Sequence, residues 1–274
     1  MIGLGAFIGD YSGSLYEFSP YTGKYEDIKV LEQGSKYTDD SVLTCAVMNW
    51  LLITNGDNDV QPLYEFYKKW GNQHKSGYGY MFYKWLKSDS TEPYNSYGNG
   101  SGMRVSPVAY WARTMDECLD LAEKTALPTH NHPEGVKGAK AIAAAIFMAR
   151  NGMTKEVIKS KLTEAFGYDL GRTVEDIRGT HKFDATCQVT VPEAIICFLD
   201  SKNFADCVRK TIWIGGDVDT IGAMACPIAE AYYGIPYLYQ EKMIKMLDRE
   251  MLGNLIMFNQ KVTQRIEPSK IVLF

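Results

Sequence analysis

Apolar residues recur at helical spacing along most of the chain, and almost no segment alternates apolar and polar residues with a period of two. Helix start and stop signals divide this pattern into segments. Pro62 is predicted to begin a helix that runs to about Trp70, and Thr114 with Glu117 forms a capping box ahead of a helix over 118–126. About ten helices are predicted in this way, with no convincing pair of strands.

The second half of the chain carries similar signals. They bound helices from His132-Pro133-Glu134 to Gly152, from Thr154 to Gly167, around Pro192 with a capping box at Thr190 and Glu193, from Asp219-Thr220 to Gly234 and Pro236, and in two amphipathic segments that start at Leu238 and Glu250. No Pro/Ser/Gly-rich linker and no block of charge divides the chain. We therefore predict one all-α domain over residues 1–274, with a short extended tail at 271–274.

Composition and charge narrow the class of protein. The chain is 46% hydrophobic and 23% charged, which is typical of a globular protein. Its 29 basic and 33 acidic residues give a formal charge of −4, and no run of Lys or Arg exceeds two residues. A polyanion-binding protein normally shows a basic stripe, so this pattern argues against nucleic acid as the main partner.

Targeting signals and cysteines bear on the expected location of the protein. The longest strictly apolar run covers nine residues, 141–149, whereas a membrane-spanning helix needs about 20. No basic residue precedes the short apolar stretch at the N-terminus, as it would in a signal peptide. The six cysteines include no CxxC pair, which favours free reduced thiols. We therefore expect a cytoplasmic protein that does not bind membranes.

Carboxylates gather at three places, each next to a glycine or a predicted helix start. These are Gly9-Asp10-Tyr11-Ser12-Gly13 followed by Glu17, Thr38-Asp39-Asp40-Ser41, and Gly215-Gly216-Asp217-Val218-Asp219-Thr220. Helix capping is the simpler interpretation of either doublet alone. Capping does not explain why two acids occur together twice, each time beside a threonine. Carboxylate and hydroxyl oxygens suit a hard cation such as Mg²⁺, and the lack of nearby His or Cys argues against zinc.

The charge of these acids is also consistent with a metal centre. If they share one site, Glu17, Asp39, Asp40, Asp217 and Asp219 carry five negative charges. Without cations they would repel one another, and some would bind protons. Two Mg²⁺ ions would leave a net charge of about −1, which makes a two-metal centre a physically sensible hypothesis.

Two further segments are candidates for ligand binding. The Gly-rich stretch 95–104 can present backbone N–H groups to an anion, with Arg104 adding charge or fixing the loop, although a plain flexible loop is the alternative. His130 and His132 lie two residues apart and would suit a metal or another ligand. Capping and anchoring the following helix is the favoured interpretation of this pair.

Five motifs occur in an order that resembles the ADP-ribosylglycohydrolase family, which includes ADP-ribosyl-acceptor hydrolases and dinitrogenase-reductase-activating glycohydrolases. They are GDYSG followed by Glu17, YTDDS, SYGNGSGMRV, LPTHNHPEGVKGA and WIGGDVDTIGAMACPIAEAYYG. The resemblance spans residues 1 to about 236. It implies a compact, orthogonal all-α bundle with two Mg²⁺ ions, or Mn²⁺ in their place, in a central cleft.

The resemblance also implies roles for individual residues. The implied metal ligands are Thr38, Asp39, Asp40, Asp217, Asp219 and Thr220. The implied catalytic residues are Glu17, next to the scissile bond, with Asp40 and Asp219. The implied substrate-binding residues are Ser96, Tyr97, Gly98, Asn99, Gly100 and His130, with Tyr97 stacking near adenine and His130 near the phosphates and distal ribose. Asp10 belongs to the first motif but is interpreted as structural.

The implied reaction is hydrolysis of the bond between the anomeric carbon of ADP-ribose and an acceptor, which is a protein side chain or a small conjugate. Two alternatives remain open at this point. One is a protein that binds ADP-ribose without cleaving it, although the complete set of acids argues against a degenerate site. The other is a two-metal phosphoester or nucleotide hydrolase. Glu17 and the SYGNG segment weakly favour an O-linked or free small substrate, and an arginine-linked acceptor remains an alternative. The loop over 71–80 is predicted to border the acceptor.

Overall fold

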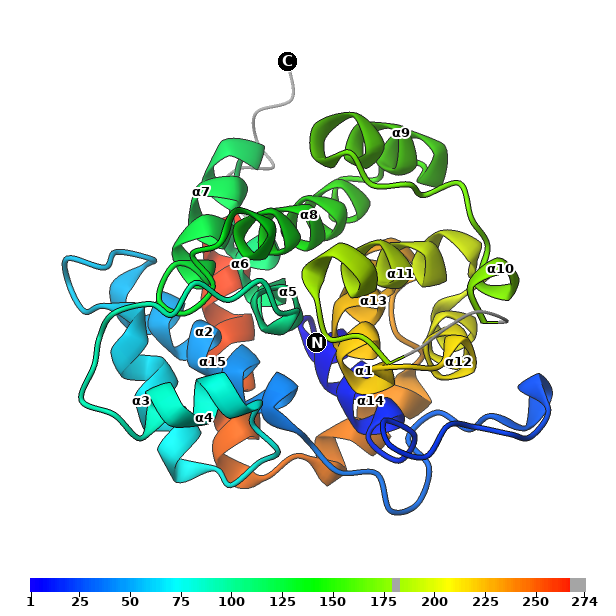
Figure 1. Ribbon diagram of the computed structural model, residues 1–274, viewed down its shortest axis with the longest axis horizontal. Helices are drawn as coiled ribbons and strands as arrows, with labels where there is room; N and C mark the ends of the chain where they lie inside the picture. The colour runs from blue at the N-terminus through cyan, green and yellow to red at the C-terminus, as the bar shows by residue number, and fades with distance from the viewer. Residues whose placement is uncertain (179–182, 267–274) are drawn as a thin grey trace.

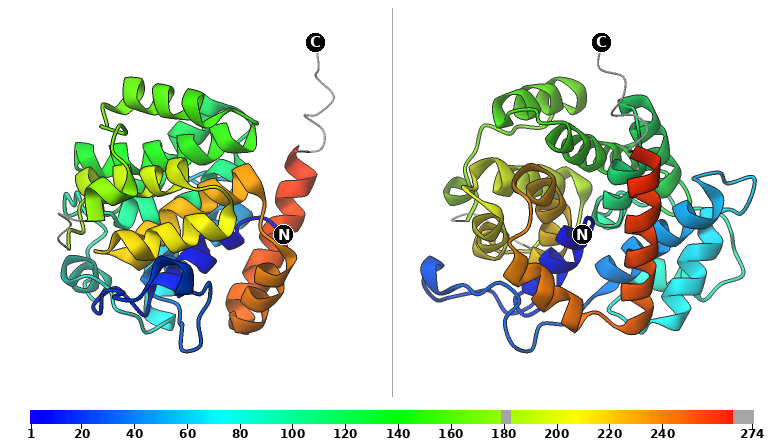
Figure 2. Two further views of the ribbon diagram at one scale, coloured as in Figure 1. Left: turned by 90° about the vertical axis from the view of Figure 1, so that its right-hand side faces the viewer. Right: turned by 180° about the vertical axis from the view of Figure 1, so that it is seen from behind.

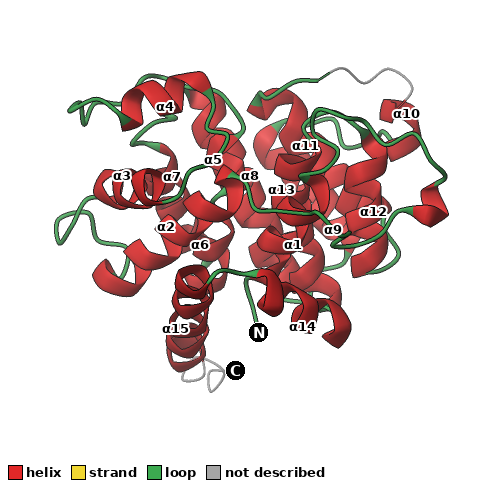
Figure 3. Ribbon diagram, turned by 90° about the horizontal axis from the view of Figure 1, so that it is seen from below, coloured by secondary structure: helices red, strands yellow, loops and turns green. Residues whose placement is uncertain are grey.

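The computed structural model describes residues 1–178 and 183–266, and within them every regular element is a helix (Figures 1 and 3). The predicted all-α class is therefore confirmed. The predicted tail at 271–274 lies outside the described residues. The helices are α1 (Leu4–Gly13), α2 (Asp39–Thr54), α3 (Leu63–Gln73), α4 (Tyr80–Leu86), α5 (Gly100–Met103), α6 (Ser106–Trp111), α7 (Met115–Ala126), α8 (Pro133–Arg150), α9 (Lys155–Phe166), α10 (Val174–Arg178), α11 (Cys187–Asp200), α12 (Phe204–Ile214), α13 (Val218–Tyr233), α14 (Tyr237–Met246) and α15 (Arg249–Ile266).

Two helices form the centre of the molecule. All ten residues of α1 are buried, and α13 is buried without interruption from Val218 to Glu230. A helix that is apolar on every side has no face for solvent, so it must lie inside a domain. Helices α2, α8, α11 and α12 pack around this central pair, and α15 runs along the back against α2 (Figure 2).

Glycine sets the distance between the two central helices. Gly5, Gly9 and Gly13 recur every four residues and therefore share one face of α1. A Cβ atom built on Gly9 would lie 2.1 Å from the carbonyl oxygen of Gly222 on α13. A Cβ atom on Gly13 would lie 2.4 Å from the Cα atom of Asp219. Backbone thus packs directly on backbone, and only glycine permits this approach.

A buried carboxylate fixes the start of α1. Glu230 on α13 accepts hydrogen bonds from the backbone N–H groups of Leu4 (3.3 Å) and Gly5 (2.9 Å) and from the hydroxyl of Tyr110 (3.0 Å). It therefore satisfies first-turn donors that have no partner within the helix. Burial raises the pKa of Glu230 to about 7.

Most predicted helix ends agree with the structure. Thr114 and Thr154 cap α7 and α9, and the ring of His132 accepts a hydrogen bond from the N–H group of Glu134 at the start of α8. The capping box predicted at Thr190 is wrong, because α11 begins three residues earlier and Thr190 donates its hydroxyl hydrogen bond to the carbonyl of Thr186. Pro192 lies in the second turn of α11, where it removes one backbone hydrogen bond without ending the helix.

The cysteines and the helix lengths bear on two further expectations. All six cysteines are buried and unpaired, as expected for free thiols. Among residues 1–178 and 183–266, no helix is both long and apolar enough to span a membrane.

The glycine contact predicts a large and local effect on stability. Gly9→Ala would force α1 and α13 apart, and we expect it to lower the free energy of unfolding by about 3 kcal/mol. Gly253→Ala is the matched control, because Gly253 lies in α15 and a Cβ atom there would meet nothing within 4 Å. Because alanine has a greater helix propensity than glycine, Gly253→Ala should stabilise the fold by up to about 1 kcal/mol. Urea unfolding of both variants checks the prediction, and equal effects would contradict it.

Candidate active site

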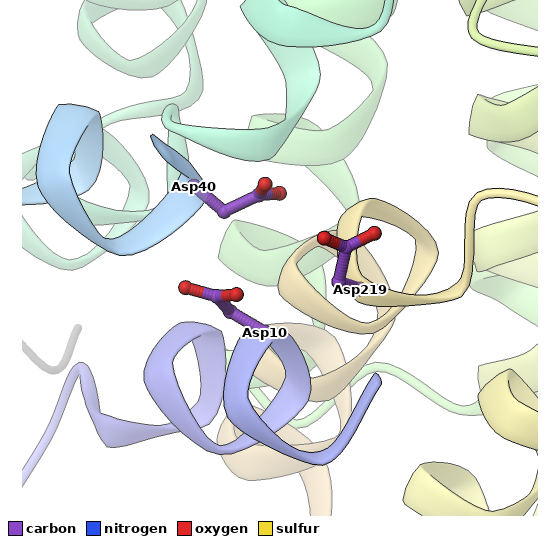
Figure 4. Close-up of side chains that lie close together, drawn as sticks. All are labelled: Asp10, Asp40 and Asp219. Carbon is purple, nitrogen blue, oxygen red and sulfur yellow. The ribbon is translucent and has the colours of Figure 1, made fainter. Parts of the chain in front are cut away.

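Three carboxylates from three helices face one another at the centre of the molecule. Asp10 comes from α1, Asp40 from the first turn of α2, and Asp219 from the first turn of α13 (Figure 4). One oxygen from each side chain lies within 4.8 Å of one oxygen from each of the others. Asp40 and Asp219 come from the two doublets far apart in the sequence, so the fold brings these doublets together.

Asp10 supports the start of α2. Its two carboxylate oxygens accept hydrogen bonds from the N–H group of Thr38 (3.0 and 3.1 Å) and from the N–H group of Ser41 (3.1 Å). The hydroxyl of Thr38 donates to it at 2.8 Å, and the hydroxyl of Ser41 also donates to it. With so many donors, Asp10 acts as the anchor of the turn before α2, in agreement with its structural interpretation.

A second group of three carboxylates adjoins the first. Glu17, Asp217 and Asp219 also bring one oxygen each within 4.8 Å of the others, so Asp219 belongs to both groups. The side-chain amide of Asn99 donates a 2.7 Å hydrogen bond to Asp217. Asn99 thereby joins the predicted substrate-binding segment to the acidic centre. Two neighbouring sites that share one carboxylate have the arrangement expected of a pair of cations.

Burial and mutual repulsion raise the pKa values of these acids. Burial is the largest cause for each of them and raises the pKa of Asp10 to about 6, of Asp39 to about 7 and of Asp219 to about 8. The pKa of Asp40 is also raised well above its usual value, first by burial and then by Asp219. Such raised pKa values show that the folded chain holds these charges at a cost unless a cation compensates them.

One atom indicates directly that a cation fits here. Oδ1 of Asp40 is buried and has no hydrogen-bond partner, whereas Oδ2 accepts from the hydroxyls of Thr38 (2.9 Å) and Thr220 (3.3 Å). A buried, unpartnered carboxylate oxygen is costly, and coordination of a cation would satisfy it. The donors in both groups are all oxygens, which suits a hard divalent cation.

The remaining predicted metal ligands take different places. Thr38 is the N-cap of α2, and its hydroxyl is engaged with Asp10 and Asp40. Asp39 belongs to neither group of three, but it lines the cavity described next. Thr220 lines the same cavity.

A cavity of about 440 Å³, here called the main cavity, opens on the acids. Most of the predicted site residues line it: Glu17, Asp39, Asp40, Ser96, Gly98, Asn99, Gly100, His130, Asp217, Asp219 and Thr220. Gly77 and Gly79 from the segment before α4 and Tyr80 at its first position also line the cavity, so part of the loop expected at the acceptor side is in the wall. The side chains of Phe82 and Tyr94 add aromatic surface.

The Gly-rich segment is more ordered than a flexible loop. Gly100 begins the short helix α5, and the N–H group of Asn99 donates to the carbonyl of Ala185 (2.8 Å). The N–H group of Gly98 donates to the hydroxyl of Ser96 (3.1 Å). These two amides are therefore already engaged, which limits the anion nest expected here.

Tyr97 does not line the main cavity. Its side chain is half exposed, and its ring packs edge-on against His132 with 5.3 Å between the ring centroids. The aromatic rings that do line the cavity belong to other segments, so the structure gives no support for the expected stacking of Tyr97 near adenine.

Arg104 is a site residue that the sequence indicated only in passing. Its side chain is fully buried, yet it reaches the wall of the main cavity, and its Nε and Nη1 atoms have no hydrogen-bond partner. The guanidinium lies 4.1 Å from the centroid of the Tyr67 ring. Within the described part of the chain no carboxylate forms an ion pair with it. A buried cation without a counterion is unfavourable, so an anionic ligand would complete this wall.

The same arginine determines how His130 presents itself to the cavity. Nη2 of Arg104 donates to the hydroxyl of Thr129 (2.6 Å), and that hydroxyl is 2.7 Å from Nδ1 of His130. Nη2 also lies 3.5 Å from Nδ1 of His130, and because an arginine nitrogen can only donate, this contact favours Nδ1 as an acceptor. The pKa of His130 is held well below its usual value, first by burial and then by Arg104, so the ring is neutral. Nε2 then carries the hydrogen and is a donor at the Gly98–Gly100 wall.

Comparison with known proteins agrees with this geometry. A sequence model of ADP-ribosylglycohydrolase matches residues 3–266. The chain belongs to the ADP-ribosylglycohydrolase family. Membership makes it a glycosidase that acts on ADP-ribose conjugates, and the resemblance seen in the five motifs is confirmed.

Individual relatives of the family cover most of the chain. The ADP-ribosylhydrolase ARH3 of Homo sapiens is 27% identical over 311 residues, and the alignment covers 84% of each protein. The ADP-ribosyl-dinitrogen reductase glycohydrolase of Rhodospirillum rubrum is 26% identical over 280 residues, with 90% of each protein covered. A solved structure described as an ADP-ribosylglycohydrolase-related protein complex has the same fold, with a TM-score of 0.71 at 22% identity over 94% of this chain and 95% of that one.

The raised pKa values predict how stability depends on pH and on Mg²⁺. Because the folded-state pKa values of Asp10, Asp39 and Asp219 lie above the unfolded values, the metal-free protein should lose stability as pH rises from about 4 to 8. Mg²⁺ should increase the stability most at a pH where these acids are ionised. We expect thermal unfolding with EDTA to show a lower Tm at pH 8 than at pH 5, and a larger rise with Mg²⁺ at pH 8.

Asp219→Asn provides the control for this measurement, because it removes the carboxylate that both groups share. On addition of Mg²⁺ at pH 8, the Tm of the variant should rise less than the Tm of the protein without the substitution. A rise of equal size at both pH values, or in both proteins, would contradict a cation site at these acids.

Proposed function

We propose that this protein is a Mg²⁺-dependent hydrolase that cleaves the bond between the anomeric carbon of ADP-ribose and an acceptor. The observation that carries the proposal is one cavity with two chemically opposite walls. Five carboxylates line one end, and the guanidinium of Arg104, which has no counterion among the described residues, lies behind another wall. ADP-ribose contains a ribose diol, which could bind cations held at the acidic end. It also contains a diphosphate, which suits the wall with Arg104 behind it.

The proposed placement of ADP-ribose follows from these walls. The diphosphate lies against Gly100 and His130, where Nε2 of His130 donates a hydrogen bond and Arg104 supplies charge. The distal ribose lies at Asp40, Asp217 and Asp219. Two Mg²⁺ ions held by Asp40, Asp217, Asp219 and the neighbouring predicted ligands would polarise water and bind the ribose diol.

Glu17 is the proposed acid or base. It is half-buried, and burial together with Asp217 and Asp39 raises its pKa to about 7 in the metal-free protein. A half-buried carboxyl group at the edge of the acidic centre can exchange a proton with a leaving group or with water, which is the requirement for general acid–base catalysis. In the proposed reaction Glu17 gives its proton to the acceptor as the bond to the anomeric carbon breaks, water adds to that carbon, and the proton that the water loses returns to Glu17.

The names of the relatives do not select one acceptor. The Rhodospirillum rubrum protein is named for ADP-ribosyl-dinitrogen reductase, and a relative from Pseudomonas putida is named ADP-ribosylarginine hydrolase Tri1. The latter is 26% identical over 144 residues, which cover 50% of this chain. We propose a protein or a small conjugate carrying ADP-ribose as the substrate, and a cytoplasmic location.

A turnover assay tests the proposed function. Purified protein with Mg²⁺ should release intact ADP-ribose from a panel of defined ADP-ribosylated peptides and small conjugates, and EDTA should abolish this release. Release of AMP or inorganic phosphate would instead support a phosphoester hydrolase. Calorimetric binding of ADP-ribose without any turnover would support a binding protein, and either result would overturn the proposal.

Two substitutions should separate chemistry from binding. Glu17→Gln keeps the size of the side chain but removes proton transfer, so we expect a fall in kcat of about 10²–10⁴-fold with nearly unchanged affinity for ADP-ribose. Asp219→Asn removes an oxygen from both groups of three and should lower both affinity and kcat. Single-turnover kinetics and calorimetry with ADP-ribose measure the two effects. Normal turnover by Glu17→Gln would rule out its proposed role.

A further inference from the structure

A second cavity adjoins the main cavity at Glu17. It has a volume of about 280 Å³, and Glu17 and Phe183 line both cavities. We call it the Arg178 cavity, after the guanidinium in its wall. The rings of Phe18 and Phe183 stack with their centroids 6.2 Å apart, and both rings line the main cavity beside Glu17. The carboxyl group proposed to protonate the leaving group is thus reached from both cavities.

The walls of the Arg178 cavity differ from those of the main cavity. Apolar surface comes from Pro20, Ile212 and Ile214, and bare backbone comes from Gly215 and Gly216. Among the described residues that line it, Arg178 is the one cation and Glu17 is the one anion. The acidic groups that suit a cation therefore lie on the other side of Glu17.

Arg178 is held in a defined orientation. It ends α10, which packs against α12 (Figure 1). Its guanidinium carbon lies 3.3 Å from the centroid of the Trp213 ring. Nη1 donates to the carbonyl of Trp213. The indole is itself fixed, because its Nε1 donates to Glu175 at 2.8 Å and the edge of the Tyr25 ring packs on it. A guanidinium fixed in this way loses little entropy when it binds a ligand.

The charge of Arg178 is not neutralised locally. Within residues 1–178 and 183–266, no carboxylate forms an ion pair with it. A guanidinium whose orientation is fixed favours a carboxylate, because planar N–H groups match carboxylate oxygens. The same charge repels a guanidinium or an ammonium group.

We propose that the Arg178 cavity holds the acceptor half of the substrate and that Arg178 selects acceptors with a carboxylate close to the linkage. The proposal rests on the proposed function, since it requires cleavage at Glu17. The favoured substrates are therefore ADP-ribosylated peptides that carry acidic residues beside the modified side chain. An arginine-linked acceptor would place a second guanidinium beside Arg178 and is disfavoured.

Two peptides that differ only in flanking charge test this selection. Both carry ADP-ribose on one serine, which Glu residues flank in the first peptide and Lys residues flank in the second. Because charge pairs at partly exposed sites contribute modestly, we expect kcat/KM to favour the acidic peptide by about tenfold. Arg178→Met should reduce the preference to about twofold or less, and Arg178→Glu should reverse it. Loss of a merely structural side chain would not reverse a preference.

Two controls keep the proposal falsifiable. The methyl glycoside of ADP-ribose has an uncharged acceptor too small to reach Arg178, so all variants should hydrolyse it at about the same rate if they fold. Arg172→Met is the matched variant, because Arg172 is exposed in the same part of the chain and does not line either cavity. It should keep the preference for the acidic peptide.

The outcomes separate this proposal from the function on which it rests. Hydrolysis of the methyl glycoside without any preference between the peptides, or a preference that Arg178→Glu leaves unchanged, would overturn the acceptor site alone. Slow hydrolysis of the methyl glycoside by folded Arg178 variants would also overturn it, because Arg178 would then act on the reacting centre. If the unchanged protein cleaves none of the three substrates, both proposals fail.

Discussion

The backbone contact between α1 and α13 is the constraint on which the site depends. Gly9 and Gly222 meet without side chains between them, and Gly13 lies against the backbone of Asp219. This approach puts Asp10 and Asp219, from opposite ends of the sequence, within reach of one another. Asp10 then holds the start of α2 through four donors, and α2 delivers Asp40. The acidic centre is therefore a consequence of helix packing, and a larger residue on this face of α1 would separate its parts.

Repulsion among the six carboxylates of this region opposes folding, and two features of the structure reduce that repulsion. The six are Asp10, Glu17, Asp39, Asp40, Asp217 and Asp219. Hydroxyl and amide donors from Thr38, Ser41 and Asn99 stabilise part of the charge, and protonation at the raised pKa values removes more of it in the metal-free state. Neither effect provides a partner for the buried Oδ1 atom of Asp40. Repulsion between the carboxylates destabilises the metal-free fold, and a bound cation removes that repulsion. The cation therefore stabilises the folded protein most where the metal-free site is most strained.

The sequence predicted the helical class and most of the acids because both leave local signals. Capping residues mark the starts of α7, α8 and α9, and paired acids beside threonine stand out without any structure. Contacts between distant segments leave no such signal. The early start of α11, the engagement of the Asn99 amide and the exposed position of Tyr97 all involve contacts with 129–132 and 185–187. Arg104 looked like a loop cation, and only its burial without a counterion shows its importance.

The half-buried position of Glu17 agrees with the role proposed for it. A residue that passes a proton to a leaving group must contact both the sugar and the acceptor, so it cannot be enclosed within the acidic centre. Glu17 follows α1 in a segment that lies between the two cavities, and both cavities include it in their walls. On one side lie Asp217 and Asp219, and on the other lies Arg178. Opposite charges on the two sides would orient a substrate whose ADP-ribose half binds cations and whose acceptor half carries a carboxylate. The bond between the two halves would then lie at Glu17, which lines both cavities.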